Sequence, residues 1–122
     1  MKKEKKNLLI TISFIVLAIA IAFAVMTLTK KPSITTDDAV AKCIGKNSVL
    51  YVQLGCSHCE DQKKLFGTNY QYLNTIDCFY QTQKCIADGI EGTPTWVIKG
   101  QKYVGVQTVE KLQELTNCNS TI

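Results

Sequence analysis

The stretch Leu54–Cys59, with the sequence LGCSHC, decides the fold of this chain, together with the apolar run Val49–Leu54 that leads into it. A nearly continuous apolar run of this length is typical of a strand buried on both faces, as at the centre of a parallel sheet. Two cysteines separated by two residues follow at once, and a polar, helix-compatible segment continues from Glu60 to Phe66. The sequence therefore predicts a strand–turn–helix junction with a Cys-x-x-Cys pair at the start of the helix.

The chemistry of this junction depends on its two sulfur atoms. A helix N-terminus favours negative charge, so we expect Cys56 to lie there with an exposed sulfur and a stabilised thiolate. Cys59 lies one turn further on, where it can close a disulfide with Cys56. A zinc site and an inert bridge are the alternatives, but the chain has no second Cys-x-x-Cys and its single histidine lies inside the motif. An exchanging disulfide, with no metal and no small cofactor, is the favoured interpretation.

His58 stands between the two cysteines. A histidine in a protein is usually a surface or core residue with no special role. Beside the Cys56 sulfur it would stabilise the thiolate, which favours the reduced state and makes the disulfide a better oxidant. Redox pairs of this kind span roughly −270 to −120 mV, and we expect this one in the oxidising half.

Thr93-Pro94 follows the Cys-x-x-Cys pair by about 35 residues and precedes an expected strand. Most bonds before proline are trans, and an ordinary turn is the simpler interpretation. A proline at the start of that strand, however, would place its loop opposite the two cysteines. We therefore expect a cis bond and predict that the Thr93 backbone pairs with an extended substrate peptide.

Four further cysteines complete an even number, which is compatible with three bridges. Cys78 and Cys85 are seven residues apart and are expected to form a structural disulfide, with a second redox pair as the alternative. Cys43 and Cys118 each lie near the end of a terminal helix. A bridge between them would fix the C-terminal helix and stabilise the domain by about 2–5 kcal/mol.

The N-terminal part has the pattern of a membrane anchor. A basic segment at residues 1–7 precedes an uncharged apolar stretch at 8–28, and 21 residues at about 1.5 Å each span a hydrocarbon core of about 30 Å. The basic end favours a cytoplasmic N-terminus, with a tether at 29–36 and the folded domain at 37–122 outside the cytoplasm. A cleaved signal peptide is the alternative, because Ala22-Phe23-Ala24 has a small-x-small form.

The charge is distributed unevenly. Residues 1–30 carry five lysines and one glutamate, whereas residues 31–122 carry nine lysines and nine acidic residues. The folded part has no basic excess, which argues against nucleic-acid binding. Six cysteines are many for a reduced cytosol, so the composition agrees with an extracytoplasmic domain.

The rest of the chain predicts a small α/β domain. Thr35, Thr36 and Asp37 are candidate caps for a first helix that ends near Gly45. The further expected elements are strand 49–54, helix 57–66, strand 70–76, helix 81–88, strand 95–98, turn 99–100, strand 101–106 and helix 109–115. This order is that of the thioredoxin fold without its leading strand: a central mixed sheet flanked by helices, here preceded by one transmembrane helix.

With these residues in view, the chain resembles the thioredoxin-like domains that are fused to, or accompany, bacterial and archaeal homologues of vitamin K epoxide reductase. The matching stretches are Ala41–Cys43, Cys56–Gly67, Ile76–Cys78, Gly89–Trp96, Gly105–Thr108 and Cys118. They cover about residues 40–118. The resemblance implies a thioredoxin fold in which Cys56 is the exchanging nucleophile, Cys59 its partner and Pro94 the cis residue.

The resemblance also implies a route for electrons. Substrate protein thiols would reduce the domain, and a quinone-reducing membrane partner of the vitamin K epoxide reductase type would reoxidise it. The family usually has proline after the first cysteine, where this chain has Ser57, and we expect the reductase to be a separate protein. The same fold working as a reductase or isomerase, and a non-catalytic, disulfide-stapled peptide-binding module, are the alternative functions.

Overall fold

The computed structural model describes residues 1–28 and 36–119, and the chain divides into two units, Met1–Ser33 and Ile34–Ile122. The first unit holds one helix, α1 (Lys2–Leu28), which is long and apolar enough to cross a membrane. A signal sequence would meet the same criteria of length and composition. The predicted tether at 29–36 and the candidate cap Thr35 lie, apart from Thr36, outside the described residues.

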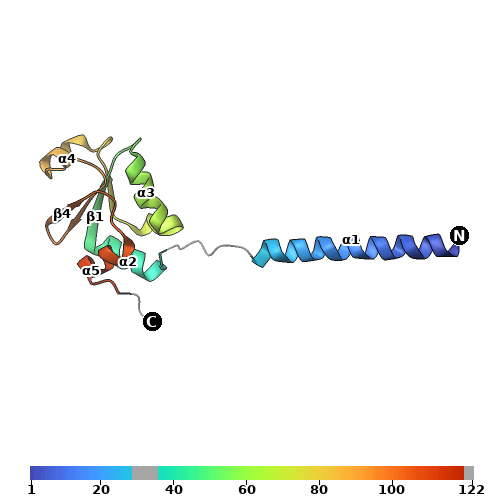
Figure 1. Ribbon diagram of the computed structural model, residues 1–122. Helices are drawn as coiled ribbons and strands as arrows, with labels where there is room; N and C mark the ends of the chain where they lie inside the picture. The colour runs from blue at the N-terminus through green and yellow to red at the C-terminus, as the bar shows by residue number, and fades with distance from the viewer. Residues whose placement is uncertain (29–35, 120–122) are drawn as a thin grey trace. The chain divides into compact units, whose positions relative to one another are not determined.

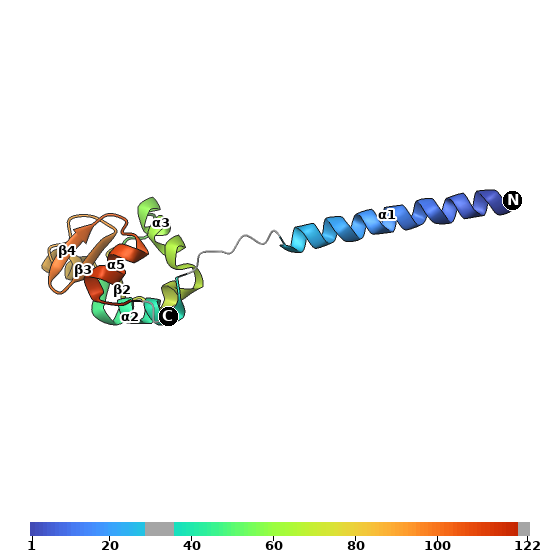
Figure 2. The ribbon, with the colours of Figure 1, turned by 60° about the horizontal axis from the view of Figure 1, so that its bottom comes forward.

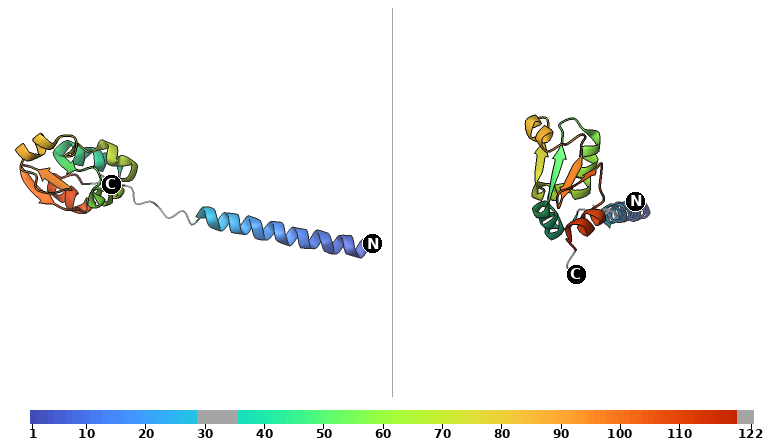
Figure 3. Two further views of the ribbon diagram at one scale, coloured as in Figure 1. Left: turned by 90° about the horizontal axis from the view of Figure 1, so that it is seen from above. Right: turned by 90° about the vertical axis from the view of Figure 1, so that its left-hand side faces the viewer.

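The second unit contains a sheet and its covering helices. Its elements in chain order are α2 (Asp38–Asn47), β1 (Ser48–Val52), α3 (Ser57–Phe66), the 3₁₀ helix η1 (Gly67–Tyr72), β2 (Thr75–Asp77), α4 (Thr82–Ala87), β3 (Thr95–Ile98), β4 (Gln101–Val104) and α5 (Val109–Thr116). Figure 1 shows α3 and α4 on opposite sides of the sheet, and Figure 3 shows the same arrangement from the side.

The sheet is mixed, and its strand order is β2-β1-β3-β4. β1 pairs in parallel with β2 and antiparallel with β3, and β4 continues antiparallel to β3. The predicted α/β class is confirmed, and this topology is that of a thioredoxin fold without its first strand. Because β1 is an inner strand, the loop at its carboxyl end emerges at the middle of the sheet edge.

The two faces of the sheet are covered differently. Leu50 lies opposite Trp96 in the β1–β3 register, so both side chains point to the same face, and both are fully buried. Residues of α2, α3 and α5 complete this core, among them Ile44, Phe66 and Leu112. Figure 2 shows α2 and α5 close together at one end of the sheet. Tyr51 points to the other face, where α4 lies.

Three strand predictions were too long, and the strand predicted at 101–106 ends at Val104. The strand predicted at 49–54 ends at Val52, and Leu54 is 57% exposed because the chain turns away from the sheet there. The strand predicted at 70–76 is confined to Thr75–Asp77. Its first half belongs to η1, whose last turn packs Tyr70 and Tyr72 against the core at partly buried positions. Apolar residues therefore face the core here from a 3₁₀ helix rather than from a strand.

The first helix of the domain was predicted too short. Asp37 caps α2 as predicted, accepting a hydrogen bond of 2.8 Å from the N–H of Ala39. The helix nevertheless continues past Gly45 to Asn47. Gly45 is buried, and a Cβ on it would overlap the carbonyl oxygen of Tyr72 in η1. Gly45 therefore allows α2 and η1 to lie close together, and it does not mark the end of α2.

This close approach predicts the effect of a single methyl group. Gly45→Ala should lower the free energy of unfolding by about 2 kcal/mol, because overpacking against backbone outweighs the roughly 1 kcal/mol by which alanine favours a helix. Urea unfolding followed by the fluorescence of Trp96, the only tryptophan, measures it. The exposed neighbour Lys46 provides the control, since Lys46→Ala should change stability by less than about 0.5 kcal/mol. Equal or higher stability of Gly45→Ala would contradict the close approach.

Candidate functional site

Cys56 is the N-cap residue of α3. Its sulfur accepts a hydrogen bond of 3.2 Å from the N–H of Cys59, and its carbonyl accepts one of 3.2 Å from Glu60. Cys56 and Cys59 are joined by a disulfide, with Cα atoms 5.2 Å apart. Cys59 is only 5% exposed, whereas Cys56 is half-buried, so an incoming thiol reaches the sulfur of Cys56 more readily.

The Thr93-Pro94 loop lies against this disulfide. The Thr93–Pro94 peptide bond is cis, and the carbonyl oxygen of Thr93 is 3.6 Å from the Cys56 sulfur. The Pro94 carbonyl accepts the N–H of Gly105 at 2.8 Å, which fixes the loop to the end of β4. Within the described residues, the N–H of Thr93 donates to no backbone carbonyl. Thr93 therefore offers a backbone edge next to a disulfide.

His58 lies on the first turn of α3, and its side chain is 76% exposed. Its Nδ1 is 3.9 Å from a carboxylate oxygen of Asp61, one turn along the helix. Among the described residues no hydrogen bond links His58 to Cys56. The effect of His58 on the thiolate remains a prediction, and it would have to act through space from an exposed position.

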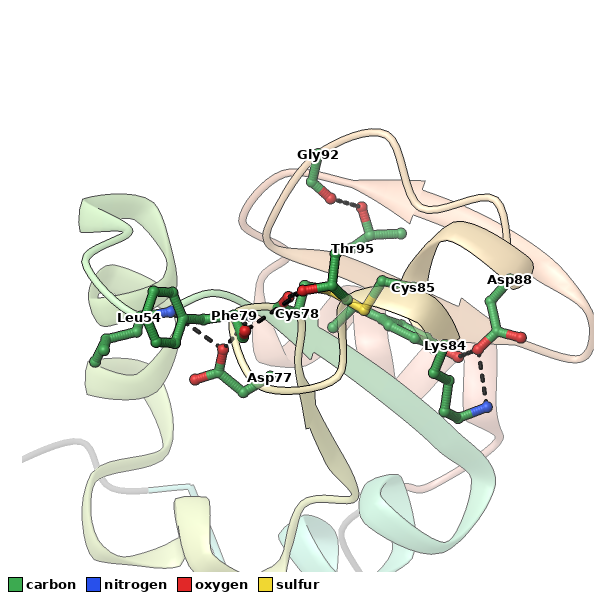
Figure 4. The surroundings of a disulfide bond; sticks show 11 residues. Leu54, Asp77, Cys78, Phe79, Lys84, Cys85, Asp88, Gly92 and Thr95 are labelled. Atoms are coloured by element: carbon green, nitrogen blue, oxygen red, sulfur yellow. Dashed lines mark hydrogen bonds and ion pairs between the residues drawn. A yellow bond between two sulfur atoms is a disulfide. The ribbon is translucent and has the colours of Figure 1, made fainter.

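Asp77 is a residue of this site that the sequence did not reveal. Its Oδ1 accepts hydrogen bonds from the N–H of Leu54 at 3.2 Å and from the N–H of Phe79 at 2.9 Å (Figure 4). One carboxylate oxygen therefore ties the loop that leads to Cys56 to the loop that follows β2. The only sign of Asp77 in the sequence is its position at the end of a predicted strand, and this position does not indicate which N–H groups donate to it.

Gln62 is the second residue that the sequence did not reveal, and its side chain is fully buried in α3. Its Oε1 accepts hydrogen bonds from Trp96 Nε1 at 2.9 Å and from the N–H of Gln107 at 2.7 Å. Its Nε2 donates to the carbonyl of Gln107 at 3.0 Å. A buried amide satisfied in this way holds the Cys-x-x-Cys helix to β3 and to the loop before α5.

The second disulfide joins Cys78 and Cys85, with Cα atoms 5.7 Å apart, and connects α4 to the end of β2 (Figure 4). Cys85 is 4% exposed. Asp88, just after α4, accepts hydrogen bonds from the Tyr51 hydroxyl at 2.7 Å and from Lys84 at 2.9 Å. Burial, followed by the Asp88 contact, raises the pKa of Tyr51 to about 12, and the Tyr51 hydrogen bond lowers the pKa of Asp88.

The third disulfide joins Cys43 on α2 to Cys118, which follows α5, across 75 residues of chain. Cys118 is 2% exposed and its Cα is 5.7 Å from that of Cys43. The structure thus brings together Cys56, Cys59, Thr93 and Pro94 at one edge of the sheet. It uses the other four cysteines to attach helices.

The Tyr51–Asp88 contact predicts the alkaline behaviour of the domain. Tyr51 should ionise only near pH 12, so the stability from its neutral form is complete below about pH 10 and is lost as the pH rises through 12. Absorbance at 295 nm follows phenolate formation, and Tyr51→Phe should remove one phenol from the transition near pH 12.

The control for this titration is Tyr80→Phe, which removes a phenol that is 72% exposed and that, among the described residues, makes no hydrogen bond with Asp88. It should leave the transition near pH 12 intact. A late transition that survives Tyr51→Phe would mean that another tyrosine is responsible.

No protein-family model matches the chain. Over 90 residues the chain is 33% identical to the thiol-disulfide oxidoreductase LTO1 of Arabidopsis thaliana. The aligned part covers 64% of this chain and 24% of that protein, so the chain spans about a quarter of the length of this curated relative. The chain is a distant homologue of a thiol-disulfide oxidoreductase, and this similarity supports a thiol–disulfide redox function.

Proposed function

We propose that the domain oxidises the thiols of substrate proteins through the Cys56–Cys59 disulfide. The observation that carries this proposal is the position of the half-buried Cys56 at the N-cap of α3, where it lies beside the Thr93 carbonyl and is bridged to the buried Cys59. A substrate thiolate can approach Cys56 along the Thr93 edge, where the peptide backbone can pair with the loop. Cys59 is buried and serves as the leaving group.

The reaction balances without a cofactor in the domain. A substrate thiolate attacks the Cys56 sulfur, which forms a mixed disulfide and releases Cys59 as a thiolate. The N–H groups at the start of the helix favour negative charge on the Cys-x-x-Cys sulfurs. A second substrate thiolate then attacks the substrate sulfur of the mixed disulfide and releases Cys56. The substrate gains one disulfide and loses two electrons and two protons, which the Cys56–Cys59 dithiol takes up.

The domain must then be reoxidised before another turnover. We place this step on a quinone-reducing membrane protein of the vitamin K epoxide reductase type, which accepts the two electrons. An uncleaved α1, with its basic end in the cytoplasm, would hold the domain on the outer side of the membrane near such a partner. An extracytoplasmic location agrees with three disulfides in so short a chain.

Trapping tests the role of the two cysteines. The full-length Cys59→Ala variant is first treated with oxidised glutathione, so that Cys56 carries glutathione as a leaving group. Substrate thiolates should then displace the glutathione and accumulate as mixed disulfides on Cys56, because Cys59 is no longer present to displace the substrate. Non-reducing gels and mass spectrometry of the adducts measure this. Cys56→Ser should give no adducts and no oxidation of a reduced test protein. Adducts that form equally well on Cys56→Ser would overturn the assignment, and failure to oxidise at all would favour a non-catalytic binding module.

The redox potential tests the direction of electron flow. We expect the Cys56–Cys59 pair to have a potential well above −270 mV, toward the roughly −120 mV of strong oxidants. Equilibration of the full-length chain with glutathione buffers measures it, with Cys56→Ser as the control for the other two disulfides. His58→Gln should lower the potential by about 30 mV, because the imidazole that favours the thiolate is lost. A value near −270 mV would instead indicate a reductase.

A further inference from the structure

We infer that the groove between α4 and the Thr93 loop binds an apolar side chain of the substrate, within two residues of its reacting cysteine. This groove has a volume of about 390 Å³, and Phe79, Ile86, Ile90, Thr93 and both cysteines of the second disulfide line it. The inference rests on the proposed function and adds a preference among substrates to it.

The groove exposes apolar surface that a monomeric domain would otherwise bury. Phe79 is 56% exposed and Ile86 is 65% exposed. The ring of Phe79 stacks edge-on against that of Tyr80, with centroids 5.0 Å apart. Side chains of this kind on one side of a pocket indicate a site for an apolar group.

The groove is held open by the fold. Its floor includes the Cys78–Cys85 disulfide, and the N–H of Ile90 donates to the Cys85 carbonyl at 2.9 Å. The backbone of Phe79 is fixed by Asp77, as Figure 4 shows. A site whose walls are already in place binds a side chain without first ordering its own residues.

The position of the groove determines which part of the substrate can enter it. Thr93 both lines the groove and places its carbonyl oxygen 3.6 Å from the Cys56 sulfur. The mixed disulfide on Cys56 therefore brings the substrate backbone to Thr93 during every cycle. An extended chain advances about 3.3 Å per residue, so a residue one or two positions from the substrate cysteine reaches the groove.

The charge around the groove indicates what it rejects. Glu91 is the one charged side chain among the described residues that line it. An acidic substrate residue would be repelled by Glu91 and would lose hydration against Phe79 and Ile86. Leucine or phenylalanine would gain from burial there. The chemistry of the site therefore favours apolar residues, disfavours acidic ones, and makes the occupant a segment that is exposed in unfolded clients.

A peptide series tests this preference on the full-length chain in phosphatidylcholine nanodiscs. Each ten-residue peptide carries two cysteines and differs only at one of the four positions that flank the first cysteine, where leucine, serine or aspartate is placed. At one of these positions leucine should raise the second-order rate constant for oxidation by the disulfide form of the chain, measured in a single turnover, at least about ten-fold over serine. Ratios within two-fold at all four positions would overturn the inference while leaving the proposed function intact. If no peptide is oxidised, the proposed function itself fails.

Two variants assign the preference to the groove. Ile86→Ser and Phe79→Ser should each reduce the leucine-to-serine ratio to less than one third of the wild-type value. The matched control is Val104→Ser, because Val104 is 67% exposed, like Ile86, and lies on β4 outside the groove. That control should keep the wild-type ratio. A ratio that falls equally in all three variants, or in none, would overturn the assignment to the groove.

Discussion

The site depends on one close approach between loops that are 37 residues apart in sequence, the 3.6 Å contact of the Thr93 carbonyl oxygen with the Cys56 sulfur. Each side of this contact is anchored separately. The Pro94 carbonyl accepts a hydrogen bond from Gly105, at the end of β4, and the buried side-chain amide of Gln62 holds α3 to β3. The carboxylate of Asp77 fixes the loop that leads to the disulfide. These polar contacts thus align the edge of the sheet that carries the Cys56–Cys59 disulfide.

Position in the fold, and not burial, distinguishes the three disulfides, because each of them joins a buried cysteine to a half-buried one. The bridge between α2 and the chain after α5 includes Cys118, which is 2% exposed, and the bridge at α4 includes Cys85, which is 4% exposed. The Cys-x-x-Cys bridge combines a buried sulfur with one at a capping position, at the start of a helix. Exchange requires an attacking thiol to reach a sulfur, so the capping position of Cys56 supports exchange there.

The sequence predicted the elements next to strong local signals. The helix 57–66 and the strand 95–98 have the bounds that were expected, because Gly67 and the Lys99-Gly100 turn mark their ends. Gly45 carries the same local signal as Gly67, yet it serves a contact with η1 that no local pattern reveals. Gln62 and Asp77 escaped prediction for the same reason, since the hydrogen bonds that tie them to other elements join residues 23 to 45 positions apart.

The three disulfides close loops of different lengths and therefore stabilise the domain to different extents. On the chain-entropy account, a bridge across 75 residues stabilises a domain by about 4.5 kcal/mol and one across seven by about 2.5 kcal/mol. The Cys-x-x-Cys bridge spans three residues, and the same account gives it the smallest contribution, about 2 kcal/mol. On the proposed function, the disulfide that would open in each cycle is therefore the one whose loss costs the fold least. The two longer bridges keep α2, α4 and the end of α5 attached while it is reduced, so a domain with a small core can undergo repeated reduction without unfolding.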